Sequence, residues 1–321
     1  MEGAADVPHL NDRAMRVADQ LVAGAGDLAV GVTHVDEARI VDAGVHTPGS
    51  IAAGLLMARV CLADLGQVGV VPGRVGQTAS PAVAVQVTHP VAACMASQYA
   101  GWRIDVGKYF AMGSGPMRAA ACKEALFDAI GCAERPQCAV GVLESAALPD
   151  DAVVRQIAEQ CRVDNDRLTL IVARTASIAG GTQIAARSVE TAMHKLHELR
   201  FDLNRVVGGY GIAPLPPVAA DDVAAIGRTN DAVLYGAEVT LYVNGDDRTL
   251  QETGRQLPSS ASKDYGEPFS VLFSRYDHDF YKIDPMLFSP AAVCLQNVES
   301  GRVHRFGKRN EQILEKSFFG E

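Results

Sequence analysis

The aromatic side chains of this chain are confined to two stretches, which limits how its first third can fold. None of the 19 aromatic residues occurs before Tyr99, five lie between Tyr99 and Phe127, and the other fourteen begin at Phe201. Seven of these fourteen fall between Tyr265 and Phe288. Residues 1–98 must therefore build a core from Ala, Val, Leu, Ile and Met, which suits helices packed closely on a sheet.

Length and composition indicate an ordered protein of two domains or lobes. The chain has 321 residues, and domains average roughly 150 residues. Hydrophobic residues make up 48% of it and charged residues 21%, so apolar burial can offset the loss of chain entropy. The net charge of −9 does not provide the basic surface that nucleic acids require, so we expect no nucleic-acid partner.

The N-terminal residues and the cysteines bear on the compartment. The start MEGAADVP carries acids where a secretory signal carries positive charge, and the longest apolar stretch is interrupted by Arg59 and Asp64. We therefore expect a cytoplasmic protein with no membrane partner. The seven cysteines include no CxxC pair, so neither a disulfide framework nor a zinc site is indicated, and most of them are expected to be buried.

Strand and helix patterns alternate over the first two thirds of the chain. Helical spacing occurs in NDRAMRVADQLVAGA and SIAAGLLMARVCLADLG, with Asn11 and Ser50 as the expected caps. Short strands are predicted for LAVGVTHV, ARIVDAGV, AVAVQVTH, CAVGVLES and RLTLIVAR, and a longer one for AVLYGAEVTLYVN. This order predicts an α/β fold with α+β character in the second lobe. The approximate lobes are residues 1–200 and 201–321, which can interleave and are expected to share an extensive interface.

One predicted helix carries side chains that are capable of chemistry. Residues 182–200, TQIAARSVETAMHKLHELR, place one apolar face toward the core, formed by Ala185, Val189, Ala192, Met193, Leu196 and Leu199. Arg187, Glu190, His194 and His197 share the opposite side, and Arg187 and Glu190 are neighbours three positions apart. They form either an ordinary surface ion pair or a carboxylate oriented inside a cleft to activate water. A metal site of Glu190, His194 and His197 is less favoured, because no HExxH motif is present.

A glycine turn joins a predicted strand to a predicted helix in YFAMGSGPMRAAACKEALFDAIG. Proline is suited to the first helical turn, so the helix is expected to begin near Pro116. Gly113 and Gly115 leave the backbone around Ser114 able to hold an anion, although a tight turn without a ligand explains them equally. The dinucleotide fingerprint GxGxxG is not met, since its third glycine would fall at Arg118.

Two further regions carry groups of polar side chains, and one of them adds aromatic residues. Residues 228–231, Arg-Thr-Asn-Asp, come just before the long predicted strand, where they either recognise a polar heterocycle or cap a turn. The segments SSASKDYGEPF and SRYDHDFYKIDPMLFSPA mix aromatic and charged residues. Such a mixture either lines a pocket for a flat ligand or forms the core of the second lobe.

Four groups of sequence strings, in this order, resemble the methenyltetrahydromethanopterin cyclohydrolase family over nearly the full length of the chain. They are ASQYAGW with AMGSGPMRA, then TASIAGGTQIAARSVETAMHK, then GYGIAPLPPVAADDVAAIGRTNDAVLYG, and finally DYGEPF with DFYKIDPMLFSPA. The chain departs from the family at Met117, where a small residue usually follows GSGP. We expect Met117 to narrow the turn without removing its backbone donors.

The resemblance implies a two-lobed α/β subunit, assembled as a homotrimer, with the substrate in a cleft between the lobes and with no metal or prosthetic cofactor. The implied substrate is a tetrahydromethanopterin derivative. Its 5,10-methenyl cation is reversibly hydrolysed to the 5-formyl compound, in the one-carbon metabolism of methane-producing archaea or methylotrophic bacteria. The family's proposed catalytic Arg and Glu match Arg187 and Glu190. Glu190 would accept a proton from the attacking water, and Arg187 would orient Glu190 and keep it ionised.

The resemblance also implies a set of pocket residues. Substrate contacts are expected from Ser97, Gly113, Ser114, Gly115, Arg118, Arg228, Thr229, Asn230, Asp231, Tyr235 and Tyr265, with Tyr99 and Tyr281 as further aromatic candidates. Three alternatives stay open: another pterin-linked one-carbon enzyme such as a formyl transferase, a non-catalytic pterin-binding protein, and an oligomeric α/β protein whose glycine turns are structural. Having both Arg187 and Glu190 argues against loss of activity, and no motif for a second substrate site is seen.

Overall fold

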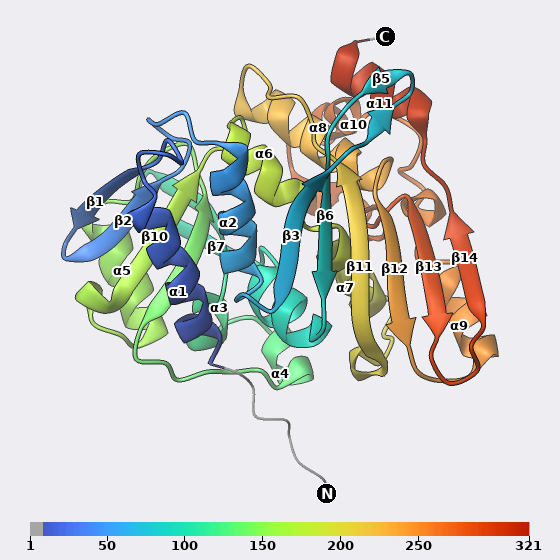
Figure 1. Cartoon of the computed structure of the whole chain (residues 1–321), viewed down its shortest axis with the longest axis horizontal. Helices are drawn as coiled ribbons and strands as arrows, with labels where there is room; N and C mark the ends of the chain where they lie inside the picture. The colour runs from blue at the N-terminus through green and yellow to red at the C-terminus, as the bar shows by residue number, and fades with distance from the viewer. Residues whose placement is uncertain (1–8, 321) are drawn as a thin grey trace, which may run out of the picture. The chain divides into compact units, whose positions relative to one another are not determined.

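The computed structural model describes residues 9–320, except for the side chain of Tyr281. Across residues 9–320 the strands form two six-stranded sheets and one two-stranded hairpin, accompanied by helices (Figure 1), so the predicted α/β class is confirmed. The residues MEGAADVP, on which the expectation of no secretory signal rests, lie outside the described residues. No helix within residues 9–320 is both long enough and apolar enough to cross a membrane.

The chain divides into two compact units that interleave along the sequence. Unit 1 contains the described residues up to Gly66 together with Ala92–Gln183, and unit 2 contains Gln67–Val91 together with the described residues from Ile184 onward. The sequence-based division at residue 200 places the helix that carries Glu190 in the first lobe, whereas the structure groups that helix with unit 2. The reason is its packing against strands of the unit 2 sheet.

The sheet of unit 1 has parallel strands at its centre and antiparallel strands at both edges. β2, β10 and β9 run parallel, while β1 pairs antiparallel with β2, β8 with β9 and β7 with β8. In sheet order the strands are β1 (Gly31–Val35), β2 (Ala38–Asp42), β10 (Leu168–Ala173), β9 (Ala139–Glu144), β8 (Tyr109–Ser114) and β7 (Trp102–Val106). The predicted strands in this region are therefore confirmed.

Helices cover both faces of the unit 1 sheet (Figure 1). α1 (Leu10–Ala23) and α2 (Ile51–Cys61) pack on one face with Val41 and Ile171, while α3 (Met117–Ala121) and α5 (Asp151–Cys161) pack on the other with Ile40 and Leu170. Because adjacent strand residues enter opposite cores, the central strands are mostly apolar on both faces. The remaining elements are η1 (Val91–Gln98), α4 (Leu126–Ile130), η2 (Asn165–Arg167) and α6 (Ile178–Ala185), of which η1 and α6 extend across the unit boundaries.

The two predicted helix caps in this unit have different outcomes. Ser50 caps α2 as expected, because its side chain accepts the backbone N–H of Ala53. The prediction for Asn11 is wrong, since α1 begins at Leu10 and Asn11 lies inside the helix. Its buried amide instead donates to the carbonyl of Pro116 and accepts from the backbone N–H of Val140. Asn11 therefore ties α1 to the start of α3 and to β9.

Unit 2 contains a second sheet with helices on one face. In sheet order its strands are β14 (Val303–Gly307), β13 (Ala292–Asn297), β12 (Glu238–Val243), β11 (Val206–Pro214), β6 (Ala82–Val87) and β3 (Gly66–Val71). α7 (Ser188–Glu198) packs on β11, β12 and β6, and α9 (Asp247–Gly254) packs on β13 and β14, so that both lie behind the sheet in Figure 1. Tyr210 and Tyr242 are exposed on strands β11 and β12.

Several aromatic residues of the final third form the core of a helical layer in unit 2. Phe269 stacks with Phe273 at a ring-centroid distance of 5.5 Å and with Phe280 at 5.6 Å, and Tyr235 and Leu314 belong to the same buried cluster. Core packing thus accounts for these aromatic residues. The helices of this layer are α8 (Asp222–Leu234), α10 (Phe269–Arg275) and α11 (Glu311–Phe319). The hairpin of β4 (Arg74–Val75) and β5 (Thr78–Ala79) accompanies them. The unit also contains four short 3-10 helices: η3 (Leu203–Arg205), η4 (Ser259–Ala261), η5 (Phe280–Lys282) and η6 (Pro285–Leu287).

The long strand predicted from AVLYGAEVTLYVN is wrong in its first half. Residues 232–234 form the end of α8, and β12 begins only at Glu238. A short apolar run such as Ala-Val-Leu fits a buried helix as well as a strand, so the pattern does not distinguish them. The helix starts upstream, where the side chain of Asp221 accepts the backbone N–H of Ala224.

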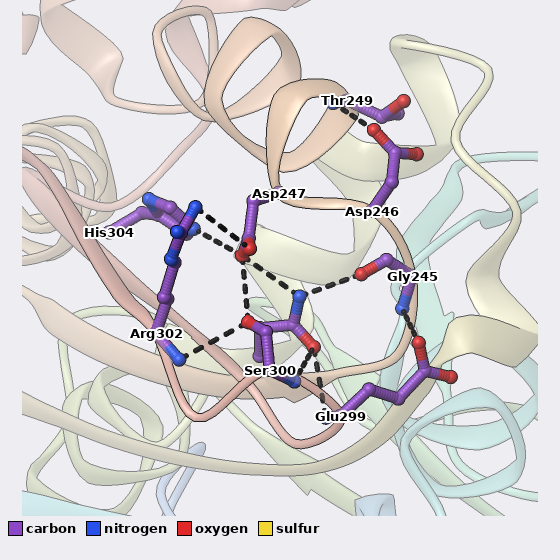
Figure 2. Close-up of polar contacts among 9 residues, drawn as sticks. Gly245, Asp246, Asp247, Thr249, Glu299, Ser300, Arg302 and His304 are labelled. Atoms are coloured by element: carbon purple, nitrogen blue, oxygen red, sulfur yellow. Dashed lines mark hydrogen bonds and ion pairs between the residues drawn. The ribbon is translucent and has the colours of Figure 1, made fainter.

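A polar network fixes the edge of the unit 2 sheet (Figure 2). The carboxylate of Asp247 accepts hydrogen bonds from Asn297 Nδ2 at 3.0 Å and Ser300 Oγ at 2.9 Å, and it lies 3.0 Å from His304 Nε2. Arg302 adds an ion pair at 3.3 Å. The hydrogen bond from His304, supported by Asn297 and Ser300, lowers the pKa of Asp247 to about 2. The network therefore links the start of α9 to the turn between β13 and β14.

The cysteines agree with the sequence-based expectation in part. All seven are free thiols, and Cys61, Cys94, Cys132 and Cys161 are buried. Cys138 and Cys294 are half-buried, and Cys122 is exposed.

Candidate functional site

The helix predicted over residues 182–200 is interrupted, and the interruption places Arg187 and Glu190. α6 ends at Ala185, α7 begins at Ser188, and Arg187 occupies the N-cap position of α7. The backbone N–H of Arg187 bonds to the carbonyl of Ile184, three residues back, so the end of α6 is tightened. The apolar period continues in phase across the break, which is why the sequence pattern predicts one helix.

Arg187 and Glu190 are buried neighbours. Arg187 Nη1 lies 3.8 Å from Glu190 Oε2, with side-chain exposures of 11% and 8%. These exposures exclude the interpretation of the pair as an ordinary surface ion pair. Glu190 lies in the first turn of α7, where the backbone N–H groups of a helix favour a negative charge. The site therefore holds a buried carboxylate beside a guanidinium at the start of a helix.

Two glycines of β11 allow the start of α7 to approach the sheet closely. A Cβ atom at Gly209 would lie 2.7 Å from Val189 Cγ1, and one at Gly211 would lie 2.3 Å from Ser188 Oγ. Side chains at these positions would push away the turn that carries Glu190. The sequence analysis misses this role, although the cluster VVGGYGIAP signals it, since glycine within a strand often marks a close approach.

The alternative metal site on α7 receives no support. His194 Nε2 lies 3.6 Å from Glu198 Oε1, and burial lowers the pKa of His194. Within residues 9–320, no group of three or more His, Cys, Asp or Glu side chains is placed to hold a metal ion.

The glycine turn of unit 1 has the predicted form, with β8 ending at Ser114 and α3 beginning after Pro116. Gly115 has a φ of +90°, and its backbone N–H donates to the carbonyl of Ser97 at 2.8 Å. The hydroxyl of Ser97 donates to the carbonyl of Cys61 at 2.5 Å, and Ser114 Oγ lies 3.3 Å from Cys61 Sγ. Ser97, Ser114 and Gly115 therefore have partners within the protein.

Met117 fills space left by two glycines. A Cβ atom at Gly113 would lie 2.7 Å from Met117 Cε, and one at Gly141 would lie 2.0 Å from its sulfur. The Met117 side chain is fully buried. The larger residue that follows GSGP in this chain is thus accommodated inside the core of unit 1.

Arg118 is buried and its guanidinium is bound within unit 1. Its Nε and Nη2 donate to the two carboxylate oxygens of Glu124 at 2.8 and 2.6 Å, and its Nη1 donates to the carbonyl of Met95 at 2.9 Å. The guanidinium also lies over the rings of Tyr99 and Phe127, at 5.0 and 5.5 Å. The strings ASQYAGW and AMGSGPMRA therefore hold each other in place.

The four polar residues before the predicted strand lie on α8, not at a turn. Thr229 and Asn230 donate back to carbonyls of their own helix, at 2.9 and 2.8 Å. Arg228 donates to the carbonyl of Val218 at 3.1 Å, while Asp231 accepts the backbone N–H of Phe269 at 2.8 Å. The expectation that these residues lie at a strand entrance is therefore wrong, and the alternative of a capped turn is excluded.

Asp231 and Tyr235 anchor the segment DYGEPF. The Tyr235 hydroxyl donates to the carbonyl of Glu267 at 2.6 Å and accepts the backbone N–H of Gly266 at 3.2 Å. Its ring lies 5.0 Å from that of Tyr265. Burial raises the pKa of Tyr235 to about 12 and that of Asp231 to about 7. The strings TNDAVLYG and DYGEPF are thus joined by these contacts.

The remaining aromatic candidates are half-buried or not described. Tyr265 is half-buried, and its hydroxyl lies 3.4 Å from Asn310 Nδ2. Tyr99 is half-buried as well, beneath Arg118. The side chain of Tyr281 lies outside the part of the structure that is described.

Comparisons with known proteins agree with the resemblance. The sequence model described as Cyclohydrolase (MCH) matches residues 9–318. A methenyltetrahydromethanopterin cyclohydrolase of Rhodopirellula baltica is 48% identical over 88% of this chain and 86% of its own length. Proteins of the same name from Methylobacterium sp. strain 4-46 and Methanosarcina barkeri are 44% and 41% identical, and they align over 97% and 96% of this chain and 98% of their own lengths. Since both comparisons cover nearly the whole chain, it belongs to the methenyltetrahydromethanopterin cyclohydrolase family of hydrolases.

Proposed function

We propose that the chain catalyses the reversible hydrolysis of 5,10-methenyltetrahydromethanopterin to 5-formyltetrahydromethanopterin, with Glu190 as the base and Arg187 as its partner. The names of the relatives support the reaction. The single observation that carries the residue assignment is the buried pair at the start of α7, with Arg187 Nη1 and Glu190 Oε2 3.8 Å apart.

The chemistry of the methenyl cation fits a carboxylate base. The methenyl carbon lies between two nitrogens that share a positive charge, so it is electrophilic before it binds. Water adds to this carbon while Glu190 accepts one of its protons. As the adduct collapses, that proton passes to the departing nitrogen and the ring C–N bond breaks. The hydroxyl of the adduct loses its own proton to the solvent and becomes the carbonyl of the 5-formyl product. Glu190 thus ends the cycle as the carboxylate with which it began.

Arg187 has two roles in this proposal. Its guanidinium orients the Glu190 carboxylate and favours its ionised form. It also forms half of a pair whose charges cancel, which matters because an unpaired buried guanidinium would repel the cationic substrate. Both roles depend on Glu190 and Arg187 being shielded from water, as they are here.

The other expectations from the resemblance belong to the same proposal. We infer that the chain needs no prosthetic cofactor, acts in the cytoplasm and assembles as a homotrimer. Among the expected pocket residues, Arg228, Asn230 and Tyr265 are half-exposed and are the more accessible candidates. Ser97, Ser114, Arg118, Thr229, Asp231 and Tyr235 are buried among structural partners.

Replacement of Glu190 tests the proposal. Glu190→Gln keeps the shape of the side chain and removes the base, so kcat should fall by about 10²- to 10⁴-fold with little change in KM. The measurement is the disappearance of the methenyl absorbance with purified protein and no added acceptor. A formyl transferase would need such an acceptor, and a binding protein would not consume the compound at all.

Asp247→Asn is the matched control, since it removes a carboxylate from a purely structural network and should retain full kcat. A Glu190→Gln variant with near-wild-type turnover would refute the assignment of the base. A wild-type protein that does not discharge the methenyl compound would refute the reaction itself.

A further inference from the structure

We propose that Lys195 is a positioning residue, which holds the helix carrying Glu190 in register by binding the backbone of η6. This inference rests on the proposed function, because it assigns to Lys195 an effect that is exerted through Glu190. Lys195 lies five residues after Glu190 on α7, about 7.5 Å further along the helix axis.

Lys195 is buried and makes a directed contact. The side chain has no exposed surface, and its Nζ donates to the backbone carbonyl of Met286 in η6. The charged groups near it are Asp284 and Glu198, while burial lowers its pKa to about 8. If α7 moved relative to η6, the buried ammonium would lose this hydrogen bond and could not replace it with one to water. The contact therefore resists movement of α7.

The acceptor itself is held by a further network. The carboxylate of Asp284 accepts the backbone N–H of Met286 at 3.1 Å and the hydroxyl of Ser262 at 2.7 Å. Asp264 in turn accepts the backbone N–H of Asp284 at 2.8 Å and lies 3.1 Å from the Tyr276 hydroxyl. The carbonyl that Lys195 binds therefore belongs to a fixed segment of unit 2.

The close contact of the start of α7 with β11 is of a different kind. There, Val189 packs against the bare backbone of Gly209. Apolar contacts favour burial but have little directional preference, so they limit rotation or sliding of a helix only weakly. The hydrogen bond of Lys195 is directional and supplies the register. A shift of about 1 Å at a reacting group is enough to cost about 100-fold in rate.

A lysine at this position is costly for stability, which separates positioning from simple packing. Burying an ammonium carries a desolvation penalty, and replacing a buried charged group by an apolar one of similar size is often neutral or stabilising. Methionine matches the unbranched stem of lysine without its charge. The inference therefore predicts that Lys195→Met lowers turnover without lowering stability.

The experiment combines kinetics with unfolding measurements on the full chain. Lys195→Met should lower kcat by about 10- to 100-fold while KM stays within about twofold. Its denaturation midpoint should be unchanged or higher. In the double variant Lys195→Met with Glu190→Gln, kcat should be no lower than in Glu190→Gln alone, because a positioning residue has nothing left to position. Asp247→Asn again serves as the control with unchanged kcat.

Each outcome bears on a separate claim. If Lys195→Met keeps wild-type kcat while Glu190→Gln is inactive, this inference is overturned and the proposed function stands. Losses that multiply in the double variant would show that Lys195 acts independently of Glu190 and would also overturn it. If Glu190→Gln remains active, the proposed function fails and this inference with it. Should Lys195→Met not fold, Lys195→Gln takes its place in the same cycle, with the same expected loss of kcat.

Discussion

The Arg118–Glu124 pair of unit 1 and the Arg187–Glu190 pair of unit 2, whose arginines are both buried, differ in geometry. In unit 1, Arg118 forms two parallel hydrogen bonds to Glu124, at 2.8 and 2.6 Å, and its guanidinium also lies over two aromatic rings. In unit 2, the ion-pair distance between Arg187 and Glu190 is 3.8 Å, which is longer than a hydrogen bond. Burial alone therefore does not distinguish the two arginines.

The difference teaches how to separate a pair that serves the fold from one that serves chemistry. Bidentate contacts engage both oxygens of Glu124 and fix that carboxylate against Arg118, so the pair holds its own segment in place. Glu190 is three residues from Arg187, at the first turn of a helix, and the ion pair between them does not take that bidentate form. In the proposed reaction, a water molecule would bind to the Glu190 carboxylate.

The largest expected effects come from removing each arginine in turn. Arg118→Met leaves the Glu124 carboxylate without its partner inside unit 1, so it should lower the free energy of unfolding by about 3–5 kcal/mol. Arg187→Met should lower kcat by about 100-fold, because the base loses its orientation. Chemical denaturation and the methenyl absorbance assay measure the two effects.

The comparison predicts that the two losses are of different kinds. Arg118→Met protein that remains folded at low temperature should keep most of its turnover per folded molecule. If both variants lost stability equally and turned over equally well, the distinction between the two pairs would not hold. The variants Arg118→Lys and Arg187→Lys, which keep the charge but lose the planar fork, refine the test.

Much of the fold could be predicted from the sequence, and the errors of that prediction have physical causes. The alternation of strands and helices in unit 1 is visible because each element buries a periodic apolar face. The break at Arg187 is not visible, since the apolar period continues through it. The sequence pattern predicts a strand at the end of α8, because a short buried apolar run fits a helix and a strand equally well.

The candidate site could be predicted only in part. Spacing makes Arg187 and Glu190 neighbours, and the family resemblance assigns them a role, but their burial depends on tertiary packing that spacing does not encode. The burial of Lys195 could not be predicted either, because lysine is usually found on protein surfaces, whereas this one lies inside unit 2. The expected binding role of Arg118 and Asp231 has no such geometric support, since both hold neighbouring backbone or side chains in place.

Asp231 extends the comparison to a buried carboxyl that has no ion-pair partner within residues 9–320. Burial raises its pKa to about 7, so the folded protein binds more protons than the unfolded chain between pH 4 and 7. The stability that the neutral acid contributes is present below about pH 4 and is lost as the pH rises to 7. We expect a loss of a few kcal/mol across this window relative to Asp231→Asn.

Urea denaturation of wild type and Asp231→Asn at several pH values measures this difference. The asparagine still offers an oxygen to the Phe269 N–H, so the variant removes the charge of Asp231 and keeps this hydrogen bond. Parallel stability curves for the two proteins between pH 4 and 7 would contradict the raised pKa. They would also mean that a buried carboxylate in unit 2 stays ionised without the arginine partner that Glu124 and Glu190 each have.

The smallest effect is expected at Asp247, where a carboxylate is paired near water. Hydrogen bonding by His304, Asn297 and Ser300 lowers its pKa to about 2, so its contribution to stability is present above about pH 4 and is lost as the pH falls toward 2. Arg302, which pairs with Asp247, is mostly exposed, and water screens that ion pair.

Asp247→Asn should therefore lower the denaturation midpoint only slightly at pH 6, and the difference from wild type should shrink as the pH approaches 3. Added salt should reduce this difference further. Salt should leave the effect of Arg118→Met nearly unchanged, because the Arg118 side chain has no exposed surface, whereas Arg302 is mostly exposed. A salt response of equal size in the two variants would show that burial of the Arg118 guanidinium does not protect its ion pair with Glu124 from screening.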